Sequence, residues 1–164
     1  AFATAAAVAV IEEYLFRGVI LGLVARTAPA PAAVVSVSAL FSILHFLKPR
    51  EGILTAEEIG PWSGFALLPH AFHQFAEPGL VLAGFTTLFV VGLILAVATR
   101  GTRSLWFAIG LHAGLILGTR TFSILARRRA VRPPRIGDDL KIGLVPLLVL
   151  LILLAVVVAY VRRR

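Results

Sequence analysis

Residues 11–17 read Ile-Glu-Glu-Tyr-Leu-Phe-Arg, and this stretch lies in the middle of an otherwise apolar segment, residues 1–25. A charged side chain at the centre of a membrane helix costs about 2.5–3.5 kcal/mol on insertion scales, whereas each Leu, Ile, Val or Phe returns about 0.3–0.6 kcal/mol. Glu12, Glu13 and Arg17 are therefore expected to face the protein interior or a water-filled cavity rather than lipid.

The composition is that of an integral membrane protein. Of the 164 residues, 59% are hydrophobic and 15% are charged, and the mean hydropathy is +0.96. The formal net charge is +8, but basic residues gather where apolar runs end, as at residues 127–129 and 162–164. Such clusters are typical of anchoring to phospholipid headgroups, so we expect the lipid bilayer as a partner and no nucleic acid.

Apolar segments along the chain predict an all-α, polytopic transmembrane helix bundle with about five spans. These segments cover residues 1–25, 32–47, 80–99, 104–126 and 142–161. The second segment is short for a bilayer of about 30 Å, which needs about 20 helical residues, so it is expected to be buried among the others. Because the chain contains no Met, we also expect the full protein to have helices upstream.

The segments divide the chain into three parts. Residues 1–126 are the predicted core, residues 127–141 a basic loop, and residues 142–164 a C-terminal transmembrane anchor helix. Within the core, residues 48–78 form a polar insertion whose aromatic stretch, residues 65–75, is expected to lie in the membrane interface.

Glu13 and Arg17 are predicted to form an ion pair. They stand four residues apart, one turn of helix, with the acid on the N-terminal side as the favourable order requires. Glu12 is displaced by about 100° around the same helix and has no local countercharge. It is therefore a candidate for proton transfer, and an ion-pair network that only holds helices together is the alternative.

Two histidines lie within apolar segments. His45 is near the end of the second segment and His112 is in the fourth. A lone histidine in a helix bundle is more often a hydrogen-bonding residue than a catalyst, but two of them beside an unpaired glutamate favour catalysis. Gly110 and Gly114 flank His112, so we expect a partner backbone to come close there.

The other two histidines, His70 and His73, lie near Glu77 in the insertion, at spacings of three and four. This spacing in a loop flanked by proline is a weak metal signal, and we expect an interfacial patch of aromatic and histidine residues instead. Asp138 and Asp139 are expected to be a solvated pair in the basic loop.

Several enzyme classes lack their residues in this chain. Cysteine is absent, which excludes disulfides, thiolate metal sites and a cysteine nucleophile. There is no His-Glu-x-x-His zinc protease helix, no Gly-x-Ser-x-Gly elbow and no Gly-rich phosphate loop. The only aspartates are adjacent, so an intramembrane aspartate dyad cannot form.

Three motifs occur in order along the core. They are Glu-Glu-x-x-x-Arg at residues 12–17, Phe-x-x-x-His at residues 41–45, and Leu-Trp followed by Ile-Gly-Leu-His within residues 105–112. Over residues 11–118 the chain resembles the CPBP family of intramembrane proteases, which includes the type II CAAX prenyl endopeptidases and the Abi or bacteriocin-processing proteins.

The resemblance implies a multi-pass membrane protease that cuts a membrane-associated, prenylated or otherwise lipidated protein. The composition, rich in Ala, Gly, Val and Arg, indicates the inner membrane of a bacterium. In the glutamic mechanism that we favour, Glu12 assisted by His45 activates water, and His112 donates to the oxyanion. Glu13 and Arg17 would position the helix that carries Glu12. No cofactor is expected, and a zinc-dependent version of the same protease is the alternative.

One position departs from the family pattern. Ile116, four residues after His112, stands where the family often carries Asn or Asp. This favours, among non-enzymatic rivals, a membrane scaffold or bacteriocin-immunity protein, and a proton or ion pathway is a further rival. Prenylated CAAX proteins, bacteriocin leaders and C-terminal sorting tails all remain open as substrates.

Overall fold

All the regular structure that the computed structural model describes is helical. The described residues are 2–49, 52–53, 59–125 and 143–163. The predicted basic loop, with Asp138 and Asp139, lies outside these residues, as do Glu51, Glu57 and Glu58 of the insertion.

The first apolar segment forms one helical run interrupted by a wider turn. It consists of α1 (Phe2–Glu13), the π-helix η1 (Tyr14–Ile20) and α2 (Leu21–Thr27). At the end of η1 the Leu21 N–H donates to the Phe16 carbonyl, five residues back. Stretches of π-helix inside an α-helix are rare and frequently occur at functional sites. This one begins directly after the two glutamates, and the sequence pattern did not reveal it.

The remaining apolar segments also form helices close to their predicted bounds. They are α3 (Ala30–Leu44), α5 (Pro78–Thr102), α6 (Leu105–Leu125) and α7 (Leu144–Arg162). The turn between α5 and α6 is short, because α5 continues to Thr102 and Arg103 adopts a left-handed conformation, with φ of 54°.

The aromatic stretch of the insertion folds into short helical pieces. These are α4 (Ser63–Leu67) and the 3-10 helices η3 (Leu68–His70) and η4 (His73–Ala76). The side chains of Trp62, Phe65 and Phe72 are exposed, as expected for a segment that lies in a membrane interface.

Within the described ranges, three helices are long and apolar enough to cross a membrane: Val81–Thr102, Leu105–Phe122 and Leu144–Arg162. The predicted membrane bundle is confirmed, but the expected five spans are not all uninterrupted apolar helices. The helix α3 is shorter, as predicted, and the first run is divided by η1 and carries charges near its middle. On α7, Leu148 and Ile152 are 59% and 66% exposed, which fits a surface that faces lipid.

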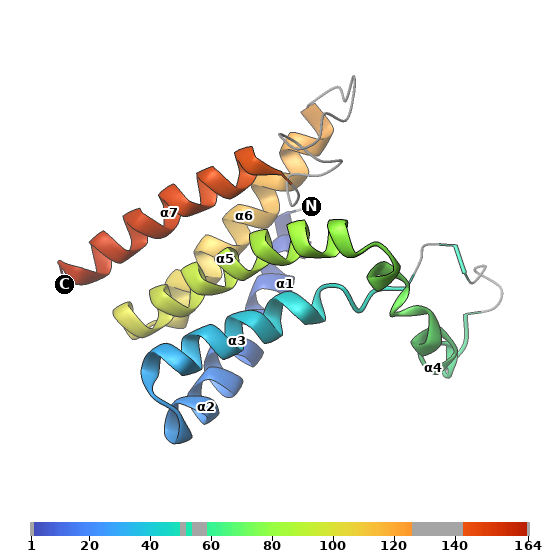
Figure 1. Cartoon of the computed structure of the whole chain (residues 1–164), viewed down its shortest axis with the longest axis horizontal. Coiled ribbons are helices and arrows are strands. Elements are labelled where there is room, and N and C mark those ends of the chain that lie inside the picture. The colour runs from blue at the N-terminus through green and yellow to red at the C-terminus, as the bar shows by residue number, and fades with distance from the viewer. Residues whose placement is uncertain (1, 50–51, 54–58, 126–142, 164) are drawn as a thin grey trace.

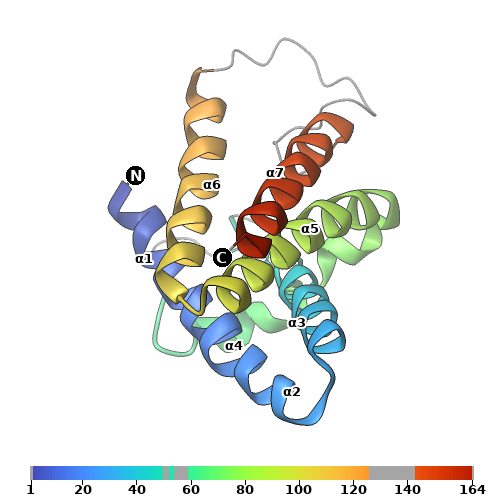
Figure 2. The ribbon, with the colours of Figure 1, turned by 90° about the vertical axis from the view of Figure 1, so that its left-hand side faces the viewer.

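The helix α5 is central to the bundle. It lies between α3 and α7, while α1 runs along α6 (Figures 1 and 2). One apolar cluster joins Phe16, Phe41 and Ala96, and a second joins Ile94 to Leu150. The first run, α3 and α6 therefore meet around the middle of α5, where the polar residues of the first run are held.

The helices α5 and α3 approach each other closely at Gly92. A β-carbon added to Gly92 would lie 2.9 Å from the Ser38 β-carbon and 3.0 Å from its α-carbon. Nearby, the Ser42 hydroxyl donates to the Phe85 carbonyl at 2.8 Å. This packing of α3 against α5 fixes the position of the Gly92 carbonyl.

We predict that Gly92→Ala destabilises the protein, because the added methyl group would push the two backbones apart. Overpacking of this kind costs about 1–3 kcal/mol. Gly22→Ala is the matched control, since nothing lies within 4 Å of the added β-carbon there. Thermal unfolding in detergent should give a lower midpoint for the Gly92 variant alone, and equal midpoints would contradict the close approach.

Candidate active site

The ion pair predicted between Glu13 and Arg17 is confirmed, and it is buried. Arg17 Nη1 donates to Glu13 Oε1 at 2.9 Å. Glu13 is 0% exposed and Arg17 is 3% exposed. Arg17 Nη2 also donates to the Gly92 carbonyl at 3.3 Å. Because α3 and α5 pack closely at Gly92, this bond ties the charged pair to the centre of the bundle.

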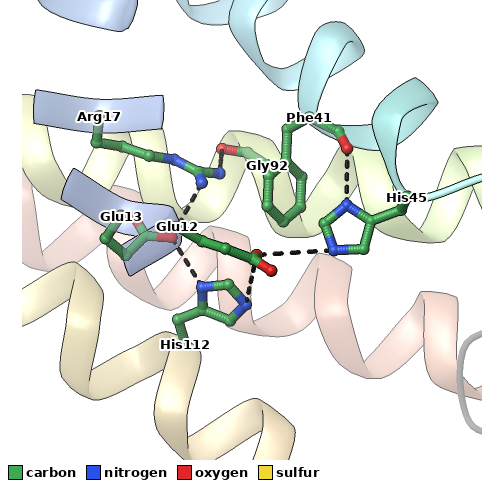
Figure 3. Close-up of polar contacts among 7 residues, drawn as sticks. All are labelled: Glu12, Glu13, Arg17, Phe41, His45, Gly92 and His112. Atoms are coloured by element: carbon green, nitrogen blue, oxygen red, sulfur yellow. Dashed lines mark hydrogen bonds and ion pairs between the residues drawn. The ribbon is translucent and has the colours of Figure 1, made fainter. Parts of the chain in front are cut away.

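His112 binds the same carboxylate. Its Nδ1 lies 2.8 Å from Glu13 Oε1 (Figure 3). A carboxylate paired with arginine accepts hydrogen bonds, so Nδ1 must carry the hydrogen and donate it. Spacing along the chain predicts only the pairing of Glu13 with Arg17, because His112 lies 99 residues from Glu13 in the sequence. Glu13 therefore fixes the orientation of the imidazole on α6 as well as neutralising Arg17.

His45 is oriented by a backbone group. It is the residue that follows α3, and its Nδ1 lies 2.8 Å from the Phe41 carbonyl one turn earlier. A carbonyl can only accept, so Nδ1 of His45 also carries a hydrogen. In the neutral ring Nε2 is then the nitrogen with the free lone pair.

Glu12 faces both histidines. Its Oε2 lies 3.7 Å from His45 Nε2 and 3.8 Å from His112 Nε2, beyond direct hydrogen-bond distance. Oε2 is buried and has no hydrogen-bond partner, although the Glu12 side chain as a whole is 28% exposed. A carboxylate and a neutral Nε2 both accept hydrogen bonds, so their convergence requires a shared proton or a donor such as water.

Phe41 contacts the cluster with its ring as well as through its carbonyl. The Arg17 guanidinium lies 4.4 Å from the centroid of its ring, a cation–π contact. The rings of His45 and His112 lie 4.3 Å and 5.9 Å from the same ring. Phe41 belongs to the Phe-x-x-x-His motif, which predicts no function for it, and the fold shows that it contacts three of the five candidate residues.

The cluster opens into a cavity of about 580 Å³. Glu12, His45 and His112 line it together with mostly apolar residues of α5, α6 and α7. Ile116 lines the same cavity. The expectation that Gly114 admits a partner backbone is wrong, because nothing lies within 4 Å of a β-carbon added there, and Gly110 is equally open.

A metal ion is the other partner that convergent histidine and carboxylate side chains can bind. In the described part of the chain, no group of three or more His, Asp or Glu side chains is arranged to hold a metal ion. This also applies to His70, His73 and Glu77, where His73 Nδ1 instead bonds the His70 carbonyl at 3.1 Å.

The cluster has the parts that hydrolysis of a peptide bond requires. It combines a carboxylate with a free oxygen, two histidines whose rings are held by their Nδ1 atoms, and a cavity beside them. A water molecule between Glu12 and His45 would have Glu12 as its base and His45 Nε2 as the acceptor that orients it.

A family model described as type II CAAX prenyl endopeptidase, Rce1-like, matches residues 1–117. The matched residues run from α1 into α6 and include the whole cluster. No curated protein and no solved structure matches the chain.

Proposed function

This chain belongs to the Rce1-like family of type II CAAX prenyl endopeptidases, and we propose that it hydrolyses the C-terminal tail of a prenylated membrane protein. The observation that carries the proposal is the convergence of Glu12 with the Nε2 atoms of His45 and His112 at 3.7 Å and 3.8 Å. Family membership implies a membrane-associated protein substrate, and the apolar helices agree with an integral membrane enzyme.

In the proposed reaction, a water molecule donates one hydrogen bond to Glu12 and the other to His45 Nε2. Glu12 takes a proton from this water while the water oxygen attacks the scissile carbonyl carbon. The carbon–nitrogen bond then breaks, and Glu12 returns the proton to the leaving amine. The products are a new carboxyl terminus and a released peptide, with no other reactant consumed.

His112 is proposed to stabilise the oxyanion that forms during this attack. For this function Nε2 must carry a hydrogen, so both ring nitrogens are protonated and Nδ1 donates to Glu13. The charges of Glu12 and Glu13 are then balanced by those of Arg17 and His112. A preorganised oxyanion donor contributes about 2.7–4 kcal/mol to transition-state stabilisation.

The structural role of Glu13 and Arg17 follows from their burial. They contact each other, the His112 ring and the Gly92 carbonyl, but they do not line the cavity. We propose that they position His112 and the helix that carries Glu12. We further propose that the enzyme needs no metal cofactor and resides in the inner membrane of a bacterium.

The substrate class is tested with purified protein in proteoliposomes. A peptide ending in Cys-a-a-X is supplied with and without an S-farnesyl group, and released tripeptide is measured by mass spectrometry. We expect release from the farnesylated peptide only. Cleavage of bacteriocin leaders or unmodified tails instead would correct the substrate class, and no cleavage of any membrane peptide would favour a scaffold.

The scaffold alternative is favoured by one feature, the apolar Ile116 beside His112 in the cavity. A stable partner that co-purifies equally with the wild type and with Glu12→Ala, without any proteolysis, would support it.

A further inference from the structure

The cavity beside the cluster contains a cation that the reaction above does not use. Arg120 lines the cavity together with Glu12, His45 and His112. The side chain is exposed. The acidic residues that the structure describes are Glu12, Glu13 and Glu77, and no ion pair joins any of them to Arg120. Arg120 is therefore available to bind an anion inside the cavity.

The distance between His112 and Arg120 matches the length of a three-residue peptide tail that ends in a carboxylate. His112 and Arg120 are eight residues apart on α6, which is about 12 Å along the helix axis. An extended peptide advances about 3.3 Å per residue. If the scissile carbonyl of the substrate lies beside His112, the three substrate residues that follow it end about 10 Å further along. That end is within reach of the Arg120 side chain.

The wall between the two residues suits an aliphatic tail. Ile116 is four residues from both His112 and Arg120, on the same face of the helix, and it lines the cavity. The open space at Gly118, where an added β-carbon would meet nothing within 4 Å, leaves room for peptide backbone beside it. The residue that departs from the family pattern thus lies where the middle of the tail would run.

We infer that Arg120 binds the C-terminal carboxylate of the substrate and thereby sets the cleavage three residues from the chain end. Arginine suits this function because its guanidinium donates two parallel hydrogen bonds to a carboxylate. The inference rests on the proposed function for the length of the tail. It adds a free C-terminal carboxylate to the features that the enzyme recognises.

The test measures binding rather than cleavage, so that it does not depend on turnover. Glu12→Gln protein in nanodiscs is titrated with a fluorescent S-farnesyl Cys-Val-Ile-Ser peptide, once as the free acid and once as the C-terminal amide. We expect the acid to bind about 10- to 100-fold more tightly, the range of a charge-assisted hydrogen-bonded pair. In the same Glu12→Gln background, Arg120→Gln should reduce the ratio of acid affinity to amide affinity to about one. Arg120→Lys should retain part of this ratio.

Arg26→Gln is the matched control, because Arg26 is an exposed arginine in the last turn of α2 and does not line the cavity. This variant should keep the full acid-to-amide ratio. Equal binding of acid and amide, absence of binding for both, or an unchanged ratio in Arg120→Gln would each overturn the inference. Failure of the wild type to cleave the farnesylated peptide would overturn the proposed function instead, whatever the binding ratio.

Discussion

Glu12→Gln should reduce turnover of a farnesylated CAAX peptide by about 10²- to 10⁴-fold, the contribution of a positioned general base. The amide keeps the shape of the carboxylate but cannot take a proton from water. Glu12 Oε2 has no hydrogen-bond partner among the residues that the structure describes, and it lies 3.7 Å and 3.8 Å from the two histidine Nε2 atoms. The substitution should therefore leave the fold intact.

The measurement is kcat for the variant and the wild type in the same proteoliposomes, with thermal unfolding to verify the fold. Glu77→Gln is the control, since Glu77 is an exposed glutamate before α5 and lies away from the cavity lining. A Glu12→Gln enzyme that retains more than about a tenth of the wild-type kcat would remove Glu12 from the chemistry.

Glu13→Ala should have the largest effect on stability. It removes the carboxylate that binds both Arg17 and His112, and it leaves a buried guanidinium with the Gly92 carbonyl as its remaining hydrogen-bond acceptor. Removal of one partner of a buried ion pair costs about 3–5 kcal/mol. Unfolding of the detergent-solubilised protein by a denaturing detergent gives the change in free energy.

A second variant separates loss of the pair from loss of volume. Arg17→Met in the Glu13→Ala background removes the unpaired charge, so part of the lost stability should return. Glu77→Ala should change stability by less than about 0.5 kcal/mol, as expected at an exposed position. If Glu13→Ala costs no more than Glu77→Ala, the buried pair does not position the cluster.

Much of the fold was predictable because membrane helices depend mainly on length and hydropathy. The ends of α6 and α7 lie within two residues of their predicted positions. The ion pair was predictable too, since Glu13 and Arg17 are local neighbours on one helix. These features depend on spacing along the chain alone.

Features that depend on packing between helices could not be read from spacing. The Gly92 carbonyl that accepts from Arg17 is 75 residues away in sequence. The π-helical turn has no composition signal, and the second function of Glu13 as the partner of His112 joins α1 to α6. For the same reason the open space beside Gly110 and Gly114 was mistaken for a site of close packing.

Metal removal distinguishes the glutamic mechanism from a zinc-dependent one, because Glu12 and the Nε2 atom of His45 present acceptors that either a water molecule or a cation could bind. Wild-type protein is treated exhaustively with a chelator, its metal content is measured, and release of the tripeptide is followed. We expect an unchanged rate in metal-free protein and no stimulation by added zinc. A rate that falls with the metal content and returns with zinc would contradict the mechanism in which Glu12 and His45 alone activate water.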